Sequence, residues 1–176
     1  SSIESNYESA GNRIMWHNIY LSLGYLSNSY GQVDGFEFHE PSDTYSVKRA
    51  LEINPNVKLW SSEYEDILRK ETFSFIADHK LFFIKTILVK IGVMLMYIAL
   101  FMNIGLVMLF YYKTNIEFHL PFLSGIAFNM IFGLLTTPHY SYLTGLFLFS
   151  VLYSIYIIDS AIFNGFVKKR MRISSK

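Results

Sequence analysis

The chain has 176 residues, no cysteine, a formal net charge of +1 and a mean hydropathy of +0.28. The absence of cysteine excludes disulfides, thiolate metal sites and cysteine nucleophiles. Residues 1–83 carry seven basic and twelve acidic side chains, whereas residues 84–176 carry eight basic and only two acidic ones. Because binding to nucleic acid needs a basic surface and the polar part of the chain is acidic, we expect no nucleic-acid partner.

The first thirteen residues, SSIESNYESAGNR, are small, polar and without a periodic apolar pattern. Such composition is typical of a mobile lead-in or of the end of a longer loop. The stretch has neither an initiator methionine nor a charged-then-apolar signal segment. We therefore expect the chain to be part of a longer translation product.

An aromatic and polar block follows in residues 15–31, MWHNIYLSLGYLSNSYG, which indicates a turn-rich segment rather than a clean helical stripe. Aromatic rings stack on sugars, and histidine and asparagine bond hydroxyl or phosphate oxygens. The alternative is that the block anchors a loop at the membrane surface, where Trp and Tyr are common. The candidate substrate-binding residues are Trp16, His17, Asn18, Tyr20, Tyr25, Asn28 and Tyr30.

A local group of acids and one histidine lies in the next loop, at Glu37, His39, Glu40 and Asp43. Carboxylates and imidazole can hold a divalent cation. The spacing matches no metal motif, however, and a solvated acidic loop explains these residues equally well. We therefore predict no metal site.

Two short helices are predicted before the apolar half of the chain. The first covers residues 43–53, with Val47, Ala50 and Leu51 on one face. The second begins at the apparent capping box Ser62-x-x-Glu65 and reaches about Asp78. We expect it to continue into the apolar stretch that follows. Residues 1–80 thus form a polar segment of helices and loops.

Three apolar stretches predict transmembrane helices at residues 81–112, 117–136 and 141–164. The 28 residues from Lys85 to Tyr112 would extend roughly 42 Å at ~1.5 Å per residue, which exceeds the ~30 Å hydrocarbon core. Lys85 and Lys90 are therefore expected to reach the headgroups. The fold class is all-α integral membrane, with three transmembrane helices after a mainly helical and loop segment.

Polar side chains within the apolar stretches are expected to form hydrogen bonds between packed helices. Only Asp159 is acidic, and one carboxylate does not define an ion or proton path. The polar residues in question are Asn103, His119, Asn129, His139 and Asp159.

The orientation signal is the basic tail at residues 165–176, because short positively charged flanks remain in the cytoplasm. Its charged residues are Lys168, Lys169, Arg170 and Arg172. With three crossings, the tail would be cytoplasmic and residues 1–80 extracytoplasmic. The lipid bilayer and other transmembrane helices are the expected partners.

The sequence contains no glycine-rich phosphate loop, Gly-x-Ser-x-Gly elbow or His-Glu-x-x-His zinc helix. We therefore assign no catalytic residue and no cofactor. Whether the chain belongs to an enzyme stays open at this point.

The order of WHNIYLSLGYLSNSYG, INPNVK and SSEYEDILRKETFSFIADHKLFFIKTILVK resembles the C-terminal part of polytopic proteins related to GT-C glycosyltransferases. The resemblance covers about Trp16 to Lys90 and includes no catalytic motif. It implies a protein that handles a lipid-linked sugar, with the polar segment near a polyprenyl-phosphate lipid. GT-C enzymes carry their catalytic acid in an early extracytoplasmic loop, so the resemblance assigns that role to no residue of this chain.

Two functions follow from these observations. The first is the C-terminal membrane part of a GT-C-like protein, in which the aromatic block lines a lipid-linked sugar site. The second is a small non-catalytic membrane subunit whose helices pack against partner helices in a larger complex.

Overall fold

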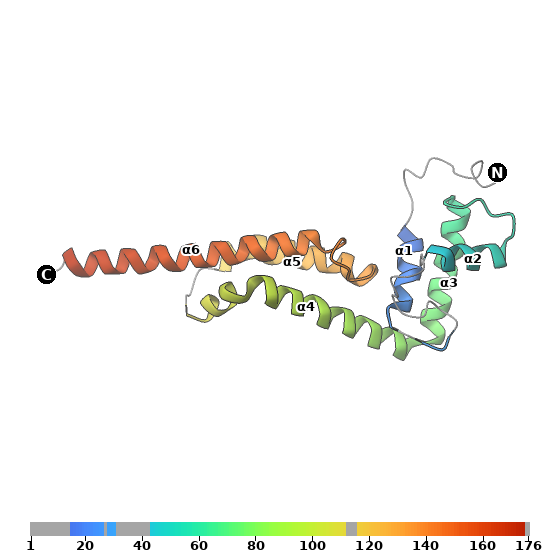
Figure 1. The fold of residues 1–176 in the computed structure, drawn as a ribbon, viewed down its shortest axis with the longest axis horizontal. Coiled ribbons are helices and arrows are strands. Elements are labelled where there is room, and N and C mark those ends of the chain that lie inside the picture. Colours follow the sequence, from blue (N-terminus) through green and yellow to red (C-terminus); the bar gives the residue numbers. More distant parts are fainter. Residues whose placement is uncertain (1–14, 27, 31–42, 112–115, 175–176) are drawn as a thin grey trace. The chain divides into compact units, whose positions relative to one another are not determined.

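The computed structural model describes residues 15–26, 28–30, 43–111 and 116–174, and within these ranges every regular element is a helix (Figure 1). The all-α class predicted from the sequence is therefore confirmed. The chain divides into two compact units. The first comprises residues 1–90 and 134–137, and the second comprises residues 91–133 and 138–176. The helices are α1 (Met15–Ser22), η2 (Leu23–Tyr25), α2 (Asp43–Ile53), α3 (Ser62–Asp78), α4 (Lys80–Tyr111), α5 (Ile116–Leu135) and α6 (Thr144–Ser174).

The first unit is built around a small hydrophobic core to which α1, η2, α2 and α3 all contribute. Burying a large apolar side chain stabilises a fold by about 1.5–3 kcal/mol, so this shared core favours packing of the four helices against one another. The rings of Trp16, Phe82 and Phe83 pack against it from the edge. Its buried members are Tyr20, Leu23, Ala50, Val57, Tyr64, Leu68 and Phe75.

The predicted bounds of α2 and α3 are confirmed, but the cap of α3 lies one residue earlier than predicted. Ser61 is the N-cap, and its Oγ accepts a hydrogen bond of 3.2 Å from the Tyr64 N–H. Two adjacent serines offer two possible caps, and Ser61 has the extended backbone that a cap requires. Within α2, Ala50 is buried as expected, whereas Leu51 is exposed.

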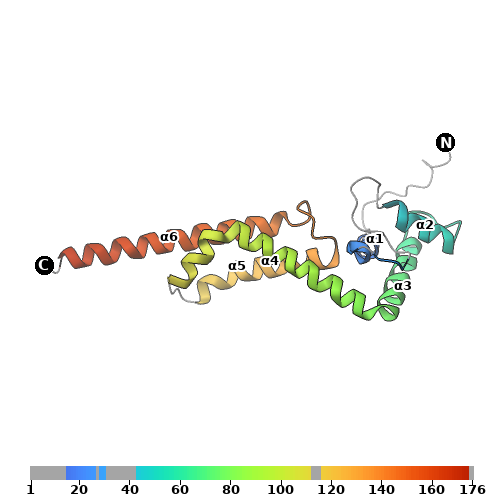
Figure 2. The ribbon, with the colours of Figure 1, turned by 60° about the horizontal axis from the view of Figure 1, so that its bottom comes forward.

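The prediction that α3 continues without interruption into the apolar stretch is wrong. Helix α3 ends at His79, whose φ of −123° and ψ of 46° are not helical, and whose N–H donates to the Phe75 carbonyl at 2.9 Å. Helix α4 begins at Lys80, and the chain changes direction at this point within the first unit (Figure 2). No proline or glycine marks the break in the sequence.

Two helical segments are long and apolar enough to cross a membrane, namely Lys80–Leu109 and Thr144–Phe163, with mean hydropathies of 2.2 and 2.0. The apolar part of α5, His119–Leu135, is shorter. Helix α6 extends past the predicted end of the third span at residue 164 and reaches Ser174. The basic tail from residue 165 is therefore helical to that residue.

Small residues bring the helices of the second unit into close contact. A Cβ added at Gly105 of α4 would lie 2.7 Å from the Ser154 Cα of α6, and the Gly105 N–H donates to Ser154 Oγ at 3.2 Å. A Cβ added at Gly145 of α6 would collide with the Asn129 amide of α5. Close approach at glycine and serine is typical of helices packed within membranes.

Aromatic and polar side chains complete the packing of the second unit. The Phe147 ring of α6 stacks on the Phe101 ring of α4 with 4.5 Å between centroids. At the start of α5, buried His119 places its Nδ1 2.7 Å from the Tyr153 hydroxyl of α6. The prediction that polar groups in these stretches join packed helices is thus confirmed for His119. The side-chain hydrogen bonds of Asn103 and Asn129 are made to the backbone of their own helices, and Asp159 is exposed.

Replacing Gly105 by Ala should destabilise the second unit, because the new methyl group would lie 2.6 Å from the Oγ and 2.7 Å from the Cα of Ser154, so that the backbone itself must move. Overpacking of this kind costs about 1–3 kcal/mol, more than the gain of up to about 1 kcal/mol in helix propensity. Gly92→Ala is the matched control, since nothing lies within 4 Å of its added Cβ. Thermal unfolding in detergent should show a lower Tm for Gly105→Ala and an equal or higher Tm for Gly92→Ala. Equal Tm values for the two variants would contradict the close α4–α6 contact.

Candidate functional site

The N-terminus of α1 is bound by a carboxylate from α3. Glu65 Oε2 accepts from the Trp16 N–H at 2.6 Å, and Oε1 accepts from the His17 N–H at 3.2 Å. These amides have no partner within their own helix, and α1 has no acidic residue in its first turn. By accepting from these amides, Glu65 stabilises the start of α1. The prediction that residues 15–25 are rich in turns is therefore wrong, since they form α1 and η2.

The imidazole of His17 faces the interior of the first unit and not a substrate. Its Nδ1 lies 2.8 Å from the Tyr64 hydroxyl and 2.9 Å from Ser46 Oγ. The Tyr64 hydroxyl lies 3.2 Å from the same Ser46 oxygen, and all three side chains are buried. These residues therefore form a polar triangle that joins α1, α2 and α3.

An indole ring covers this triangle. The Trp60 ring meets the His17 ring edge-on with 4.7 Å between centroids. Trp60 has a φ of 66°, in the left-handed region that a bulky side chain adopts only when its surroundings require it. In this conformation the Trp60 ring also meets the Tyr64 ring edge-on, with 5.4 Å between centroids.

The remaining predicted binding residues do not gather on one surface with His17. Tyr20 is a core residue, and Trp16 packs on Phe73 with 5.4 Å between ring centroids. Asn28 stabilises a local turn, since its Nδ2 donates to the Leu26 carbonyl at 3.2 Å and its Oδ1 accepts from the Tyr30 N–H at 3.0 Å. Asn18 is partly buried.

Tyr30 is the most exposed of the predicted binding residues, with 48% of its surface accessible. Its ring stacks on the His79 ring with 4.0 Å between centroids and 22° between planes. Phe75 and Phe82 meet it edge-on. The aromatic group therefore lies at the break between α3 and α4.

The prediction that Lys90 reaches the headgroups is wrong. Its side chain lies inside the first unit, with 1% of its surface exposed. Its Nζ donates to the Thr136 carbonyl at 2.7 Å and to the Leu134 carbonyl at 3.2 Å. The Tyr25 ring lies 5.8 Å from the same ammonium group. A cation suits the carbonyl end of α5, where peptide dipoles concentrate negative charge.

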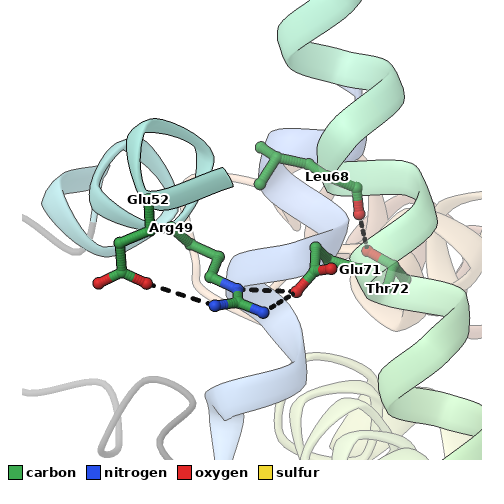
Figure 3. A network of polar contacts seen from close by, with 5 residues as sticks. All are labelled: Arg49, Glu52, Leu68, Glu71 and Thr72. Carbon is green, nitrogen blue, oxygen red and sulfur yellow. Dashed lines mark hydrogen bonds and ion pairs between the residues drawn. The ribbon is translucent and has the colours of Figure 1, made fainter. Parts of the chain in front are cut away.

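A second polar network joins α2 to α3 near the surface (Figure 3). The Arg49 guanidinium donates to one Glu71 oxygen, with Nη2 and Nε at 2.6 and 2.7 Å, and Glu52 lies 3.3 Å from Nη1. The hydrogen bond to Glu71 raises the pKa of Arg49. Because the guanidinium is about two-fifths exposed, water screens the pair, and we expect a contribution below about 1 kcal/mol.

The acidic group Glu37, His39 and Glu40 lies outside the described residues, as do the side chains of Asp43 and of the basic tail. Among the described residues, no three His, Asp or Glu side chains are grouped to hold a metal ion. The cation interpretation of the acidic loop is therefore untested.

Sequence reasoning missed the residues that organise the first unit, namely Ser46, Trp60, Glu65 and Lys90. Glu65 was assigned to the cap of its own helix because its spacing from Ser62 fits a capping box. An available signal was the lack of any acid in the first turn of α1, which leaves its amides in need of an external acceptor.

Replacing Glu65 by Gln should lower the free energy of unfolding of the first unit by about 1–3 kcal/mol, because an amide supplies one acceptor where the carboxylate supplies two. Trp16 and Trp60, the only tryptophans of the chain, both lie in this unit, so tryptophan fluorescence during urea unfolding in detergent reports it. Asp78→Asn, on an exposed side chain, is the control and should leave the curve unchanged. An unchanged midpoint in Glu65→Gln would contradict the capping role.

The same variant should change how stability depends on pH. Burial raises the pKa of Glu65 above its ordinary value of 4.5, against the opposing effect of the Trp16 and His17 N–H groups. Between 4.5 and this raised value the folded state retains a proton that the unfolded state releases, so the free energy of unfolding falls as pH rises through that range, above which Glu65 is ionised in both states. Unfolding at several pH values should show this decline in the natural chain and not in Glu65→Gln.

Comparison with known proteins reveals no relative: no family model matches the chain, and neither a curated protein nor a solved structure matches it. The resemblance to GT-C proteins from Trp16 to Lys90 therefore stays a prediction.

Proposed function

We propose that this chain is an integral membrane protein that acts as a non-catalytic helical part of a larger membrane assembly. The observation that carries the proposal is the exposure of its most apolar helices. In the most apolar part of Lys80–Leu109 only 17% of the residues are buried. In the most apolar part of Thr144–Phe163 the buried share is 33%. A core helix of a soluble protein would bury most of such a segment, whereas lipid or partner helices can cover it here.

The inner contacts of the second unit support the same proposal. Glycine lies at the α4–α6 contact with Ser154 and at the α5–α6 contact with Asn129, so the helices meet through small residues. Their outer faces carry large apolar side chains such as Leu100, Phe128 and Ile155, all more than half exposed. This distribution is typical of a helical bundle in lipid. Lipid tails are as apolar as leucine side chains, so large side chains gain little by moving from lipid into a helix interface.

The non-catalytic part of the proposal rests on how the reactive groups are used. The imidazole of His17, the hydroxyl of Ser46 and the carboxylate of Glu65 all bond within the first unit. Each is buried and occupied by a structural partner. A catalytic role would require these groups to meet a substrate, and their positions favour a structural role instead.

We further propose three crossings, with residues 1–80 extracytoplasmic and the C-terminus cytoplasmic. Helix α5 has 20 residues, which at ~1.5 Å per residue is about the ~30 Å of the hydrocarbon core. The basic tail favours a cytoplasmic end of α6.

The three-span topology can be tested by cysteine labelling, because the chain has no cysteine of its own. Lys70→Cys, on an exposed position of α3, and Lys176→Cys should react with a membrane-impermeant maleimide from opposite sides of sealed vesicles. Detergent-opened vesicles, in which both should react, provide the control. Labelling of both from the same side would contradict three crossings, and release of the chain by alkaline carbonate would contradict membrane integration.

A second candidate function is binding of a lipid-linked sugar, as the resemblance to GT-C proteins implies. The observation that favours it is the exposed ring of Tyr30 at the α3–α4 break, stacked on His79. Aromatic faces of this kind stack on sugar rings. Tyr25 and Asn18, from the same block, are also partly exposed.

This candidate predicts that Tyr30→Ala weakens labelling of the purified chain by a photoreactive polyprenyl-phosphate sugar. Loss of one stacking contact should reduce labelling about fivefold, equivalent to about 1 kcal/mol. Tyr142→Ala is the control, because Tyr142 is equally exposed but lies outside the block. Equal labelling of both variants would remove Tyr30 from the site, and no labelling of the natural chain would remove the second candidate.

A further inference from the structure

The first three turns of α4, residues 80–90, have two faces of different kinds. Phe82 and Phe83 pack against the core of the first unit, and Thr86 and Lys90 are buried on the same side. This segment is therefore fixed to the folded first unit and is not a free extension of the apolar helix.

The opposite face of these three turns is apolar and uncovered. Leu81, Ile84 and Leu88 are 84%, 52% and 62% exposed. Their spacing of three and four residues places them on one side of the helix. Three large aliphatic side chains in a row on the surface of a folded unit need an apolar environment, because water disfavours their exposure.

The charges beside this face are positive. Lys85 lies on the same side between Ile84 and Leu88, Lys80 lies next to it, and both are exposed. From residue 79 to residue 109 the sequence contains no Asp or Glu, and the nearest acid is Asp78. Lys90 is bonded to carbonyl groups in the interior, so Lys80 and Lys85 are the lysines of this segment that remain at the surface.

We propose that Leu81, Ile84 and Leu88, together with Lys80 and Lys85, form a contact surface for anionic phospholipid at the boundary between headgroups and acyl chains. The aliphatic side chains enter the acyl boundary, and the two ammonium groups bind lipid phosphates. The length of the helix supports this placement, since Lys80–Leu109 has 30 residues, or about 45 Å, against a ~30 Å core. The inference rests on the proposed membrane integration and adds that the first unit itself is seated on the bilayer.

Lipid selectivity tests the charged part of the surface. The purified full chain in mixed micelles with equal phosphatidylglycerol and phosphatidylcholine should retain more phosphatidylglycerol in native mass spectrometry. Since a lysine near an anionic surface contributes about 1 kcal/mol, the Lys80→Gln/Lys85→Gln variant should lose roughly a fivefold preference per lysine. The control Lys48→Gln/Lys70→Gln removes two exposed lysines of α2 and α3 and should keep the preference. Equal loss in both pairs would show a general charge effect and overturn the inference.

The depth of the apolar face is tested separately with single cysteines carrying an environment-sensitive nitrobenzoxadiazole dye in phosphatidylglycerol vesicles. Leu81→Cys and Leu88→Cys should give blue-shifted emission, whereas the control Lys70→Cys should emit as in water. Water-like emission at positions 81 and 88 in a chain that resists carbonate extraction would overturn the contact surface while leaving membrane integration intact. A chain that carbonate extracts would instead remove the proposed function on which the inference rests.

Discussion

The first unit depends on one carboxylate at the start of one helix. An eight-residue helix such as α1 is too short to be stable alone, and its free amides need an acceptor. Glu65 provides both acceptor oxygens from α3, and this attachment brings Tyr20 and Leu23 onto the core residues Tyr64 and Leu68. The polar triangle of His17, Ser46 and Tyr64 then joins α2 to the same pair of helices.

At the C-terminus of α5, the Lys90 ammonium group likewise bonds backbone groups that have no partner within the helix. Buried Lys90 donates to the carbonyls of Leu134 and Thr136, and Ser22 Oγ donates to the Leu135 carbonyl at 3.0 Å. The carbonyl groups of the last two residues of α5 and of Thr136, which follows it, thus accept hydrogen bonds from side chains of α1 and α4. A lysine that looked like a headgroup contact in the sequence is therefore part of the interior of the first unit.

These uses of polar groups bear on function. Among the residues that suggested a sugar site, His17 and Tyr20 are buried in the first unit and contact only the protein interior. Tyr30 is the one that is exposed. Most of the exposed large apolar side chains among the described residues lie on α4, α5 and α6, and they include Leu81, Ile84 and Leu88 in the first three turns of α4, beside Lys80 and Lys85. This distribution over the described residues supports the proposal of lipid contact and helix packing in a membrane assembly.

The sequence by itself determined the helical class, the bounds of α2 and α3 and the location of the apolar helices, because periodicity, proline turns and uninterrupted hydropathy are local properties. It also predicted that His119 would bond within the packed helices. Only the tertiary structure decided that residues 15–25 are helical, that α3 stops at His79 and that Lys90 is buried. The helix at residues 15–25 depends on Glu65 and the burial of Lys90 on Thr136, both distant in sequence, and at the end of α3 the His79 ring stacks on Tyr30. No local pattern encodes such contacts.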